Sequence, residues 1–299
     1  MTHEDDVKAV IPPLSFEMHK GQYGKVGIVG GCVEYTGAPY YAGISALKTG
    51  VDLCHIFCAP EAATPIKCYS PELIVHPFLS LSTVEKITPV LGRLDALVVG
   101  PGLGRDPDIL DAAKAIVSAA KAIQLPVVLD GDALFLLSND ISLIHGYPHA
   151  ILTPNIMEYG RLCVSLGLMD KLDLTLAAAI SPDLLATKLG HVTVLQKGRV
   201  DKISNGHAVV EQASQGSPRR CGGQGDVLAG SVGAFLAWHG AKLKRAPTSV
   251  PRNALTLAAL GGSLLTRECA RLAFQHHQRA TTTPEMIASI HAAFQNLFG

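Results

Sequence analysis

The chain has 299 residues, of which 48% are hydrophobic, and 25 basic side chains balance 25 acidic ones. So large an apolar fraction can build a sizeable buried core, which excludes a disordered chain. The even charge balance argues against a nucleic-acid or membrane-surface partner.

From about residue 25 onward, short apolar runs that end in glycine or a polar residue alternate with helical patterns. The runs predict buried strands at 25–31, 52–57, 95–100, 126–130, 150–155 and 191–198. Helices are expected at 40–49, after the N-cap Asp106 with Pro107 as first helical residue, after 155, and near 253–270 and 284–297. Residues 199–213 predict a hairpin that turns at Asn205-Gly206, and the basic segment 242–251 predicts a loop between helices.

This alternation predicts an α/β fold, with a mostly parallel sheet covered by helices on both faces. No linker is long enough to separate two domains, so residues 1–299 are expected to form one domain. The seven cysteines contain no CxxC pair, and we expect free thiols in a reducing compartment. The acidic N-terminus lacks the apolar core of a signal peptide, and the uncharged stretch 227–238 is too short to span a bilayer. We therefore expect a cytoplasmic protein.

The most informative segment is the glycine loop 219–230, in which Gly222, Gly223 and Gly225 precede Asp226. Glycines let backbone N–H groups approach a ligand, and a helix that begins here adds a partial positive charge. Both features predict an anion site for a phosphoryl group. A carboxylate disfavours simple phosphate binding, but Asp226 could take a proton from a hydroxyl that attacks a phosphate. The alternative is a tight turn in which Asp226 only caps the helix.

Other predicted strands also end in glycine-rich or polar turns, and in a parallel sheet these turns share one edge. They are the turns 100–104, 130–132, 153–158 and 197–198. Each has a structural alternative: the first two could be sharp turns, and Asn155 with Glu158 fits a helix capping box. Their joint presence favours a ligand site. The chain contains no GxxxxGK[ST], GxGxxG, HExxH or GxSxG motif, which disfavours a P-loop enzyme and a Rossmann dehydrogenase.

These motifs, in this order, resemble the ATP-dependent NAD(P)H-hydrate dehydratases of the ribokinase-like superfamily. The resemblance spans about residues 15–298 and rests on six segments, 20–31, 35–39, 100–104, 130–134, 153–158 and 222–230. Gly131 departs from the alanine that many members have, which is a change of one small residue for another. The resemblance implies a ribokinase-like three-layer sandwich. It also implies ATP-dependent dehydration of the S epimer of hydrated NADH or NADPH, with release of ADP and phosphate.

The resemblance also implies roles for individual residues. Asp226 would be the catalytic base on the C6 hydroxyl of the hydrate. ATP would contact Lys197, Gly198, Arg199, Val200, Asp201, Gly216, Ser217, Pro218, Arg219, Arg220, Cys221, Gly222, Gly223, Gln224 and Gly225. The hydrate would contact Gly102, Gly104, Asn155, Ile156, Met157, Glu158, Tyr159, Gly160, Arg161 and Asp226. Glu158 would hold Mg²⁺ through water.

Two rival functions stay open at this stage. An ordinary ribokinase-like kinase, such as a vitamin-precursor kinase, would share Asp226 but would release a stable phosphorylated product. A nucleotide-binding protein without catalysis would gain nothing from a carboxylate beside phosphates. The preference between hydrated NADH and NADPH and the oligomeric state, a homo-oligomer included, are not fixed by the sequence.

Overall fold

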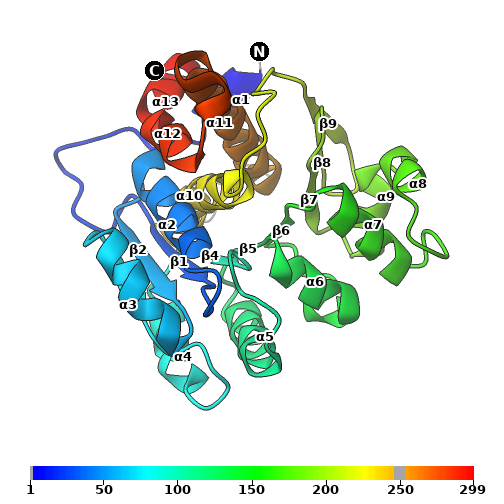
Figure 1. Ribbon diagram of the computed structural model, residues 1–299, viewed down its shortest axis with the longest axis horizontal. Helices are drawn as coiled ribbons and strands as arrows, with labels where there is room; N and C mark the ends of the chain where they lie inside the picture. Colours follow the sequence, from blue (N-terminus) through cyan, green and yellow to red (C-terminus); the bar gives the residue numbers. More distant parts are fainter. Residues whose placement is uncertain (1–2, 246–252) are drawn as a thin grey trace.

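A central sheet of nine strands organises the protein, in the order β3-β2-β1-β4-β5-β6-β7-β8-β9 (Figure 1). The computed structural model describes residues 3–245 and 253–299. All pairs from β3 to β7 are parallel, and β8 and β9 complete the sheet as an antiparallel hairpin. The strands are β1 (Lys25–Val29), β2 (Leu53–Phe57), β3 (Leu73–His76), β4 (Ala96–Val99), β5 (Val127–Leu129), β6 (Ala150–Leu152), β7 (Thr193–Gln196), β8 (Asp201–Ser204) and β9 (Val209–Gln212).

The central strands are apolar throughout because helices cover both faces of the sheet. In β4, Ala96 and Val98 join one hydrophobic core, while Leu97 and Val99 join the other. Successive side chains of a strand point to opposite faces, so a strand that is buried on both sides cannot alternate apolar with polar residues. This explains why the sequence shows continuous apolar runs.

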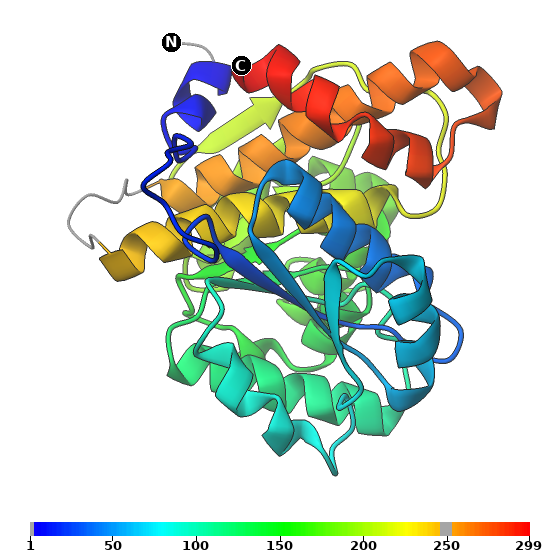
Figure 2. The ribbon, with the colours of Figure 1, turned by 90° about the vertical axis from the view of Figure 1, so that its left-hand side faces the viewer.

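Two helical layers sandwich the sheet (Figure 2). The first layer consists of α1 (His3–Lys8), α2 (Gly37–Thr49), α3 (Pro60–Tyr69), α10 (Gln224–Arg245), α11 (Ala254–His277), α12 (Thr283–Ala288) and α13 (Ile290–Phe298). The second consists of α4 (Thr88–Leu91), α5 (Pro107–Ala122), α6 (Asp132–Asn139), α7 (Ile156–Ser165), α8 (Leu174–Ala179) and α9 (Pro182–Lys188). The predicted three-layer α/β sandwich with a mostly parallel sheet is therefore confirmed.

Most of the predicted elements are present, with shifted ends. Asp106 is the N-cap of α5, since its side chain accepts from the backbone N–H of Asp108 and Ile109, and the hairpin turns at 205–206 as expected. The single helix expected at 284–297 was wrong, because the chain forms two helices that meet at Ser289. Residues 242–245 continue α10 instead of starting a loop, and 246–252 lie outside the described residues.

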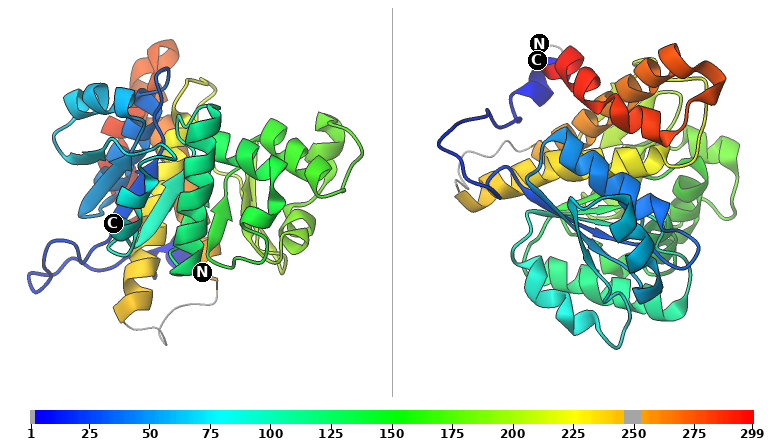
Figure 3. Two further views of the ribbon diagram at one scale, coloured as in Figure 1. Left: turned by 90° about the horizontal axis from the view of Figure 1, so that it is seen from below. Right: turned by 60° about the vertical axis from the view of Figure 1, so that its left-hand side comes forward.

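The two ends of the described chain lie side by side (Figure 3). Lys8 Nζ in α1 donates to the carbonyl of Gly299 at a distance of 2.8 Å. Within the described residues, no helix is long and apolar enough to cross a membrane. All seven cysteines lie in the described part and are unpaired, as predicted.

The strand order fixes where ligands can bind. From β1 the chain moves outward to β2 and β3, and it then returns to place β4 on the other side of β1. Loops beyond β1 and β4 therefore diverge, which opens a crevice at the carboxyl edge of the sheet. The turns after β4, β5, β6 and β7 all emerge at this edge.

Candidate active site

Asp226 lies in the first turn of α10, which begins directly after the glycine loop. Gly223 has φ +91°, a conformation that L side chains rarely adopt, and it is followed by Gln224 as the first residue of the helix. The free N–H groups of this turn and the helix dipole favour negative charge here. Only burial and neighbouring charges act on the Asp226 carboxyl, and no hydrogen bond within the described chain holds it. Its role as a helix cap is therefore not supported.

Two carboxyl groups lie at a single lysine beside Asp226, which is the third carboxyl group of the cluster. Lys197 Nζ donates to Asp130 Oδ1 at 2.8 Å and lies 3.9 Å from Glu158 Oε2. The same Asp130 oxygen accepts from Thr153 Oγ1 at 2.7 Å. The first turn of α10 packs against the Asp130–Lys197 ion pair at Gly225. A Cβ at this position would lie 3.7 Å from Asp130 Oδ2 and 3.8 Å from Lys197 Nζ. The ends of β5, β6 and β7 and the start of α10 thus meet at one cluster.

The cluster carries more acid than base, and this shifts its pKa values. Burial raises the pKa of Asp226 from 3.8 to about 8, with the Asp130 charge adding to the rise and Lys197 opposing it. Burial also raises the pKa of Glu158, again against the pull of Lys197. For Lys197 burial lowers the pKa, but Asp130 and Glu158 raise it, and the net shift is upward. Asp226 is therefore poised to exchange a proton near neutral pH.

The predicted capping box at the start of α7 is present. Asn155 Oδ1 accepts from the backbone N–H of Met157 and Glu158 at 2.9 and 3.0 Å, and Glu158 Oε2 accepts from Asn155 N at 2.7 Å. This bond fixes one Glu158 oxygen and turns the carboxyl toward Lys197. Glu158 is therefore both a cap and a member of the charged cluster.

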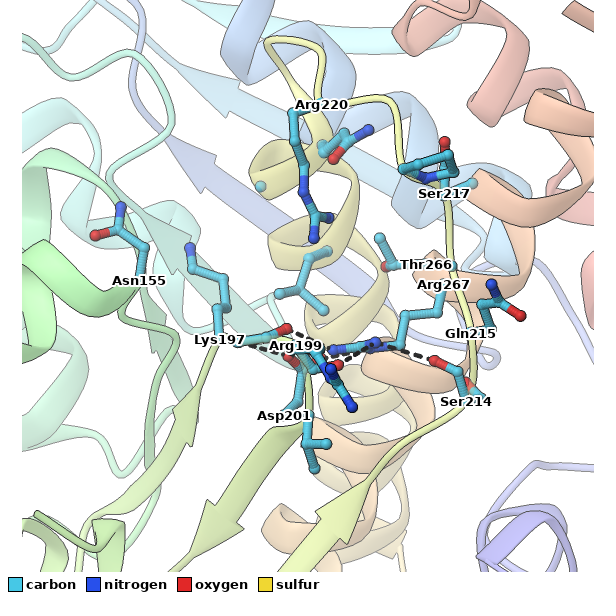
Figure 4. Close-up of a pocket in the computed structure, with 18 of the residues that line it drawn as sticks. Asn155, Lys197, Arg199, Asp201, Ser214, Gln215, Ser217, Arg220, Thr266 and Arg267 are labelled. Atoms are coloured by element: carbon cyan, nitrogen blue, oxygen red, sulfur yellow. Dashed lines mark hydrogen bonds and ion pairs between the residues drawn. The ribbon is translucent and has the colours of Figure 1, made fainter. Parts of the chain in front are cut away.

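A cavity of about 820 Å³ opens next to the cluster, a volume typical of small-molecule sites (Figure 4). Four cations line it against the single carboxylate of Asp201. In Figure 4, Asn155 and Lys197 stand on one side, and Arg220 reaches into the cavity from the loop before α10. Thr266, Ala270 and Met286 add a less polar wall. A cationic cavity at a helix N-terminus suits a polyphosphate.

Arg267 forms the floor of this cavity. Its guanidinium donates to both Asp201 oxygens, at 3.0 and 2.7 Å, and to the carbonyls of Gly198, Arg199 and Ser214. Asp201 also accepts from Ser263 Oγ and from Gly198 N, at 2.7 and 2.9 Å. The Asp201 carboxylate is thereby saturated, so it holds the cavity wall together.

Most residues predicted to contact ATP are brought together in this cavity. Those that line it are Lys197, Gly198, Arg199, Val200, Asp201, Gly216, Ser217, Pro218, Arg220, Gln224 and Gly225. Arg219, Cys221, Gly222 and Gly223 lie in the same loop but do not line the cavity. Cys221 is half-buried, and its sulfur accepts from Gln224 Nε2 at 3.4 Å.

The residues predicted to contact the hydrate are more dispersed. Asn155 lines the cationic cavity, whereas Gly104 lines a second cavity. Tyr159 is fully buried and donates to the Ile180 carbonyl, and Gly160 packs so closely that a Cβ would meet Leu172 at 2.6 Å. These two positions serve packing. Met157 is exposed, Ile156 and Arg161 are half-buried, and Gly102 accepts at its carbonyl from Gly31 N.

No role was predicted for Arg267, and Asp130 was considered only as part of a turn. An arginine in a largely apolar helix gives no signal in a sequence, because its partners lie 53–69 residues away in the chain. The sequence position of Asp130 could have indicated a role at the site, since it directly follows a buried strand at the edge where ligands bind. Among the described residues, no group of three His, Cys, Asp or Glu side chains is arranged to hold a metal by itself.

The chain has the fold of ribokinase-like proteins. A ribokinase-like protein from Enterococcus faecalis superposes with a TM-score of 0.77 at 22% identity, covering 98% of this chain and 94% of that one. An ADP/ATP-dependent NAD(P)H-hydrate dehydratase from Bacillus subtilis, co-crystallised with ATP and Mg²⁺, superposes with a TM-score of 0.74 at 22% identity, covering 98% and 97%.

The chain belongs to the NAD(P)H-hydrate dehydratase family, whose model matches residues 26–292. The ATP-dependent (S)-NAD(P)H-hydrate dehydratase of Homo sapiens is 51% identical over 295 residues, covering 98% of this chain and 83% of the relative. The corresponding protein of Arabidopsis thaliana is 46% identical over 311 residues, covering 98% and 84%. The family resemblance predicted from the sequence is confirmed.

Proposed function

We propose that the chain is an ATP-dependent (S)-NAD(P)H-hydrate dehydratase, which repairs hydrated NADH or NADPH. The observation that carries this proposal is Asp226. Its carboxyl has no hydrogen-bond partner among the described residues, its pKa is raised to about 8, and it lies at the start of α10 beside a cationic cavity. Relatives that share about half of its sequence over nearly its full length bear this activity in their names.

The chemistry follows from the different leaving abilities of hydroxide and phosphate. The ionised form of Asp226 takes the proton of the C6 hydroxyl while that oxygen attacks the γ-phosphorus of ATP, and ADP leaves. The lone pair of the ring nitrogen then expels phosphate from C6. Loss of a proton from C5 restores the dihydronicotinamide. The balance is hydrate and ATP to NAD(P)H, ADP, phosphate and one proton.

The first-turn N–H groups of α10, with Lys197 and Arg220, stabilise the charge that develops on the transferring phosphoryl group. The remaining residues predicted at 197–201 and 216–225 shape the ATP site around the polyphosphate, with Arg267 and Asp201 fixing its floor. Residues 155–158, Arg161 and the turn that holds Gly102 and Gly104 border the hydrate. One ribokinase-like domain, residues 1–299, carries all of these segments.

The residues beside Asp226 fit a magnesium ion held through water and phosphate. Asp130 and Glu158 offer carboxylate oxygens at the cluster, and one lysine cannot neutralise three carboxyl groups. Magnesium prefers one or two carboxylates with several waters and substrate phosphates, so the lack of a three-residue cage among the described residues agrees with this mode. When bound, Mg²⁺ would neutralise phosphate charge. Glu158 would orient its waters.

The test is to incubate the protein with the S epimer of hydrated NADH and to follow the return of dihydronicotinamide absorbance. Absorbance should return only when ATP and a divalent metal are present. Return without any nucleotide would remove the phosphorylation mechanism. A stable phosphorylated product, seen by phosphorus NMR, would favour the vitamin-precursor kinase instead. ATP turnover that ignores the hydrate would favour a nucleotide-binding protein without this catalysis.

A further inference from the structure

A second cavity, of about 690 Å³, lies at the carboxyl edge of the sheet and is not used by ATP in the proposed mechanism. The loops that follow β1, β2, β3 and β4 form its walls. The strand order reverses between β1 and β4 (Figure 1). This cavity therefore occupies the crevice where open α/β sheets bind their ligands. The cationic cavity lies further along the sheet, beside β6 to β8.

The turn after β4 separates the second cavity from the catalytic cluster. Gly104 lines the cavity and its N–H donates to Asp132 Oδ2 at 3.0 Å. Asp132 is two residues from Asp130, which pairs with Lys197 in the cluster. A ligand whose reacting end lies against Asp226 could therefore extend across this turn into the second cavity. A dinucleotide has a second nucleoside that can occupy such a neighbouring cavity, whereas a nicotinamide ring alone has none.

The charge of the second cavity is opposite to that of the first. Four carboxylates and one cation, Arg105, line it. Two of the carboxylates are engaged in the fold: Asp106 caps α5, and Asp108 accepts from Leu81 N. The other two, Glu34 and Glu61, are exposed, and Glu34 is held at the wall by the Cys32 thiol at 3.3 Å.

This lining rejects phosphates and accepts hydroxyl groups. Free carboxylates are acceptors for the two hydroxyls of a ribose, and an acidic side chain on a ribose 2′-hydroxyl is how many dinucleotide sites select NAD. Val33 and Ile109 provide apolar surface for a neutral base. Arg105 is not a strong phosphate ligand here, because its side chain lies 3.6 Å from Asp132 and covers the Phe135 ring.

We propose that this second cavity binds the adenosine end of the dinucleotide hydrate, and that Glu34 and Glu61 favour the free 2′-hydroxyl of hydrated NADH over the 2′-phosphate of hydrated NADPH. The inference rests on the proposed dehydratase function and adds its substrate preference. At an assumed separation of about 7 Å, two carboxylates repel a phosphate of charge about −2, screened at physiological salt, enough to lower its affinity about fivefold.

The experiment measures kcat/KM for both S hydrates at saturating MgATP. The wild-type protein should prefer hydrated NADH about fivefold. The pair Glu34→Gln and Glu61→Gln should bring the ratio close to one, and the pair Glu34→Lys and Glu61→Lys should reverse it. The KM for ATP should not change. Glu72→Gln is the matched control, since Glu72 is exposed and precedes β3 at the opposite edge of the sheet.

If the ratio of kcat/KM for hydrated NADH to that for hydrated NADPH is the same in the wild type, the double glutamine variant and the double lysine variant, the inference is wrong, while the dehydratase function stays intact. Absence of turnover with both hydrates would refute the proposed function. Calorimetric binding of NAD⁺ and NADP⁺, with ADP filling the cationic cavity, reports the same preference without turnover. Equal binding of both in the wild type would also count against the adenosine site, and a preference for NAD⁺ that the glutamine pair removes would support it.

Discussion

Replacing Asp226 with asparagine separates the two roles that the sequence allowed for this residue. The change keeps the size of the side chain and its capacity to accept a hydrogen bond, but it removes the base. If Asp226 accepts the hydroxyl proton, turnover should fall by roughly 10²–10⁴-fold, which corresponds to about 3–5 kcal/mol of barrier. ATP should still bind.

The same substitution should stabilise the fold, because the folded protein holds this carboxyl at a raised pKa of about 8. Between about pH 4 and pH 8 the unfolded chain releases this proton while the folded chain keeps it, so the folded state loses stability as pH rises through that window. Each pKa unit corresponds to about 1.4 kcal/mol, which gives an upper bound of about 4 kcal/mol at pH 7. Solvent relaxation reduces this to about 1–3 kcal/mol, or a rise in Tm of roughly 2–8 °C.

The assay combines scanning calorimetry at pH 4 and pH 7 with ADP release in the presence of the hydrate. The gain in Tm should be present at pH 7 and nearly absent at pH 4. Asp173→Asn is the matched control, since Asp173 is a true N-cap that accepts from Thr175 N and Leu176 N at 2.8 and 3.0 Å. The control should change neither Tm nor turnover appreciably. Near-normal turnover of Asp226→Asn, or a lower Tm at pH 7, would refute the reasoning.

Three further predictions follow from the structure. Glu158→Gln should change the stability contributed by the α7 capping box by no more than about 1 kcal/mol, but it should raise the Mg²⁺ concentration needed for half-maximal activity. An unchanged metal titration with a lower Tm would mean that Glu158 acts only as a helix cap. Arg267→Met should lower Tm and raise the KM for ATP more than it lowers kcat, because it leaves the buried Asp201 carboxylate unpaired. The control Arg271→Met breaks a half-buried pair with Glu268 that lies outside the cavity lining; equal effects of the two variants on the KM for ATP would contradict the floor role. Burial and the neighbouring His76 lower the pKa of His55 to about 4, so stability should fall as pH drops from about 6.5 to 4, and His55→Gln should flatten the Tm profile in that window; an unaltered profile would exclude His55 as the cause.

Local patterns were enough to predict the fold class from the sequence. The buried strands from β4 to β7 showed as continuous apolar runs, and the α5 N-cap and the hairpin turn at 205–206 were set by local chemistry. The edge strand β3 was missed because it is short and ends at a half-exposed histidine. The helix α3 was missed because Pro65 lies inside it, where proline usually argues against a helix.

The candidate site was less predictable because its contacts are not local. Asp226 and the Asn155–Glu158 pair stood out by their spacing, but nothing in the sequence shows that Asp130 pairs with Lys197, 67 residues away. Tyr159 follows Glu158 directly and yet points into the core, because adjacent residues of a helix face different directions. Side-chain direction and long-range pairing therefore had to come from the three-dimensional structure.

The central claim is that phosphorylation of the hydrate by ATP drives its dehydration at Asp226. The most direct measurement follows ADP, inorganic phosphate and dihydronicotinamide together in one reaction with the S epimer of hydrated NADH. The account predicts one ADP and one phosphate for each NADH restored, with no phosphorylated dinucleotide accumulating. NADH restored without ADP, or ADP formed with a lasting phosphorylated product, would contradict it.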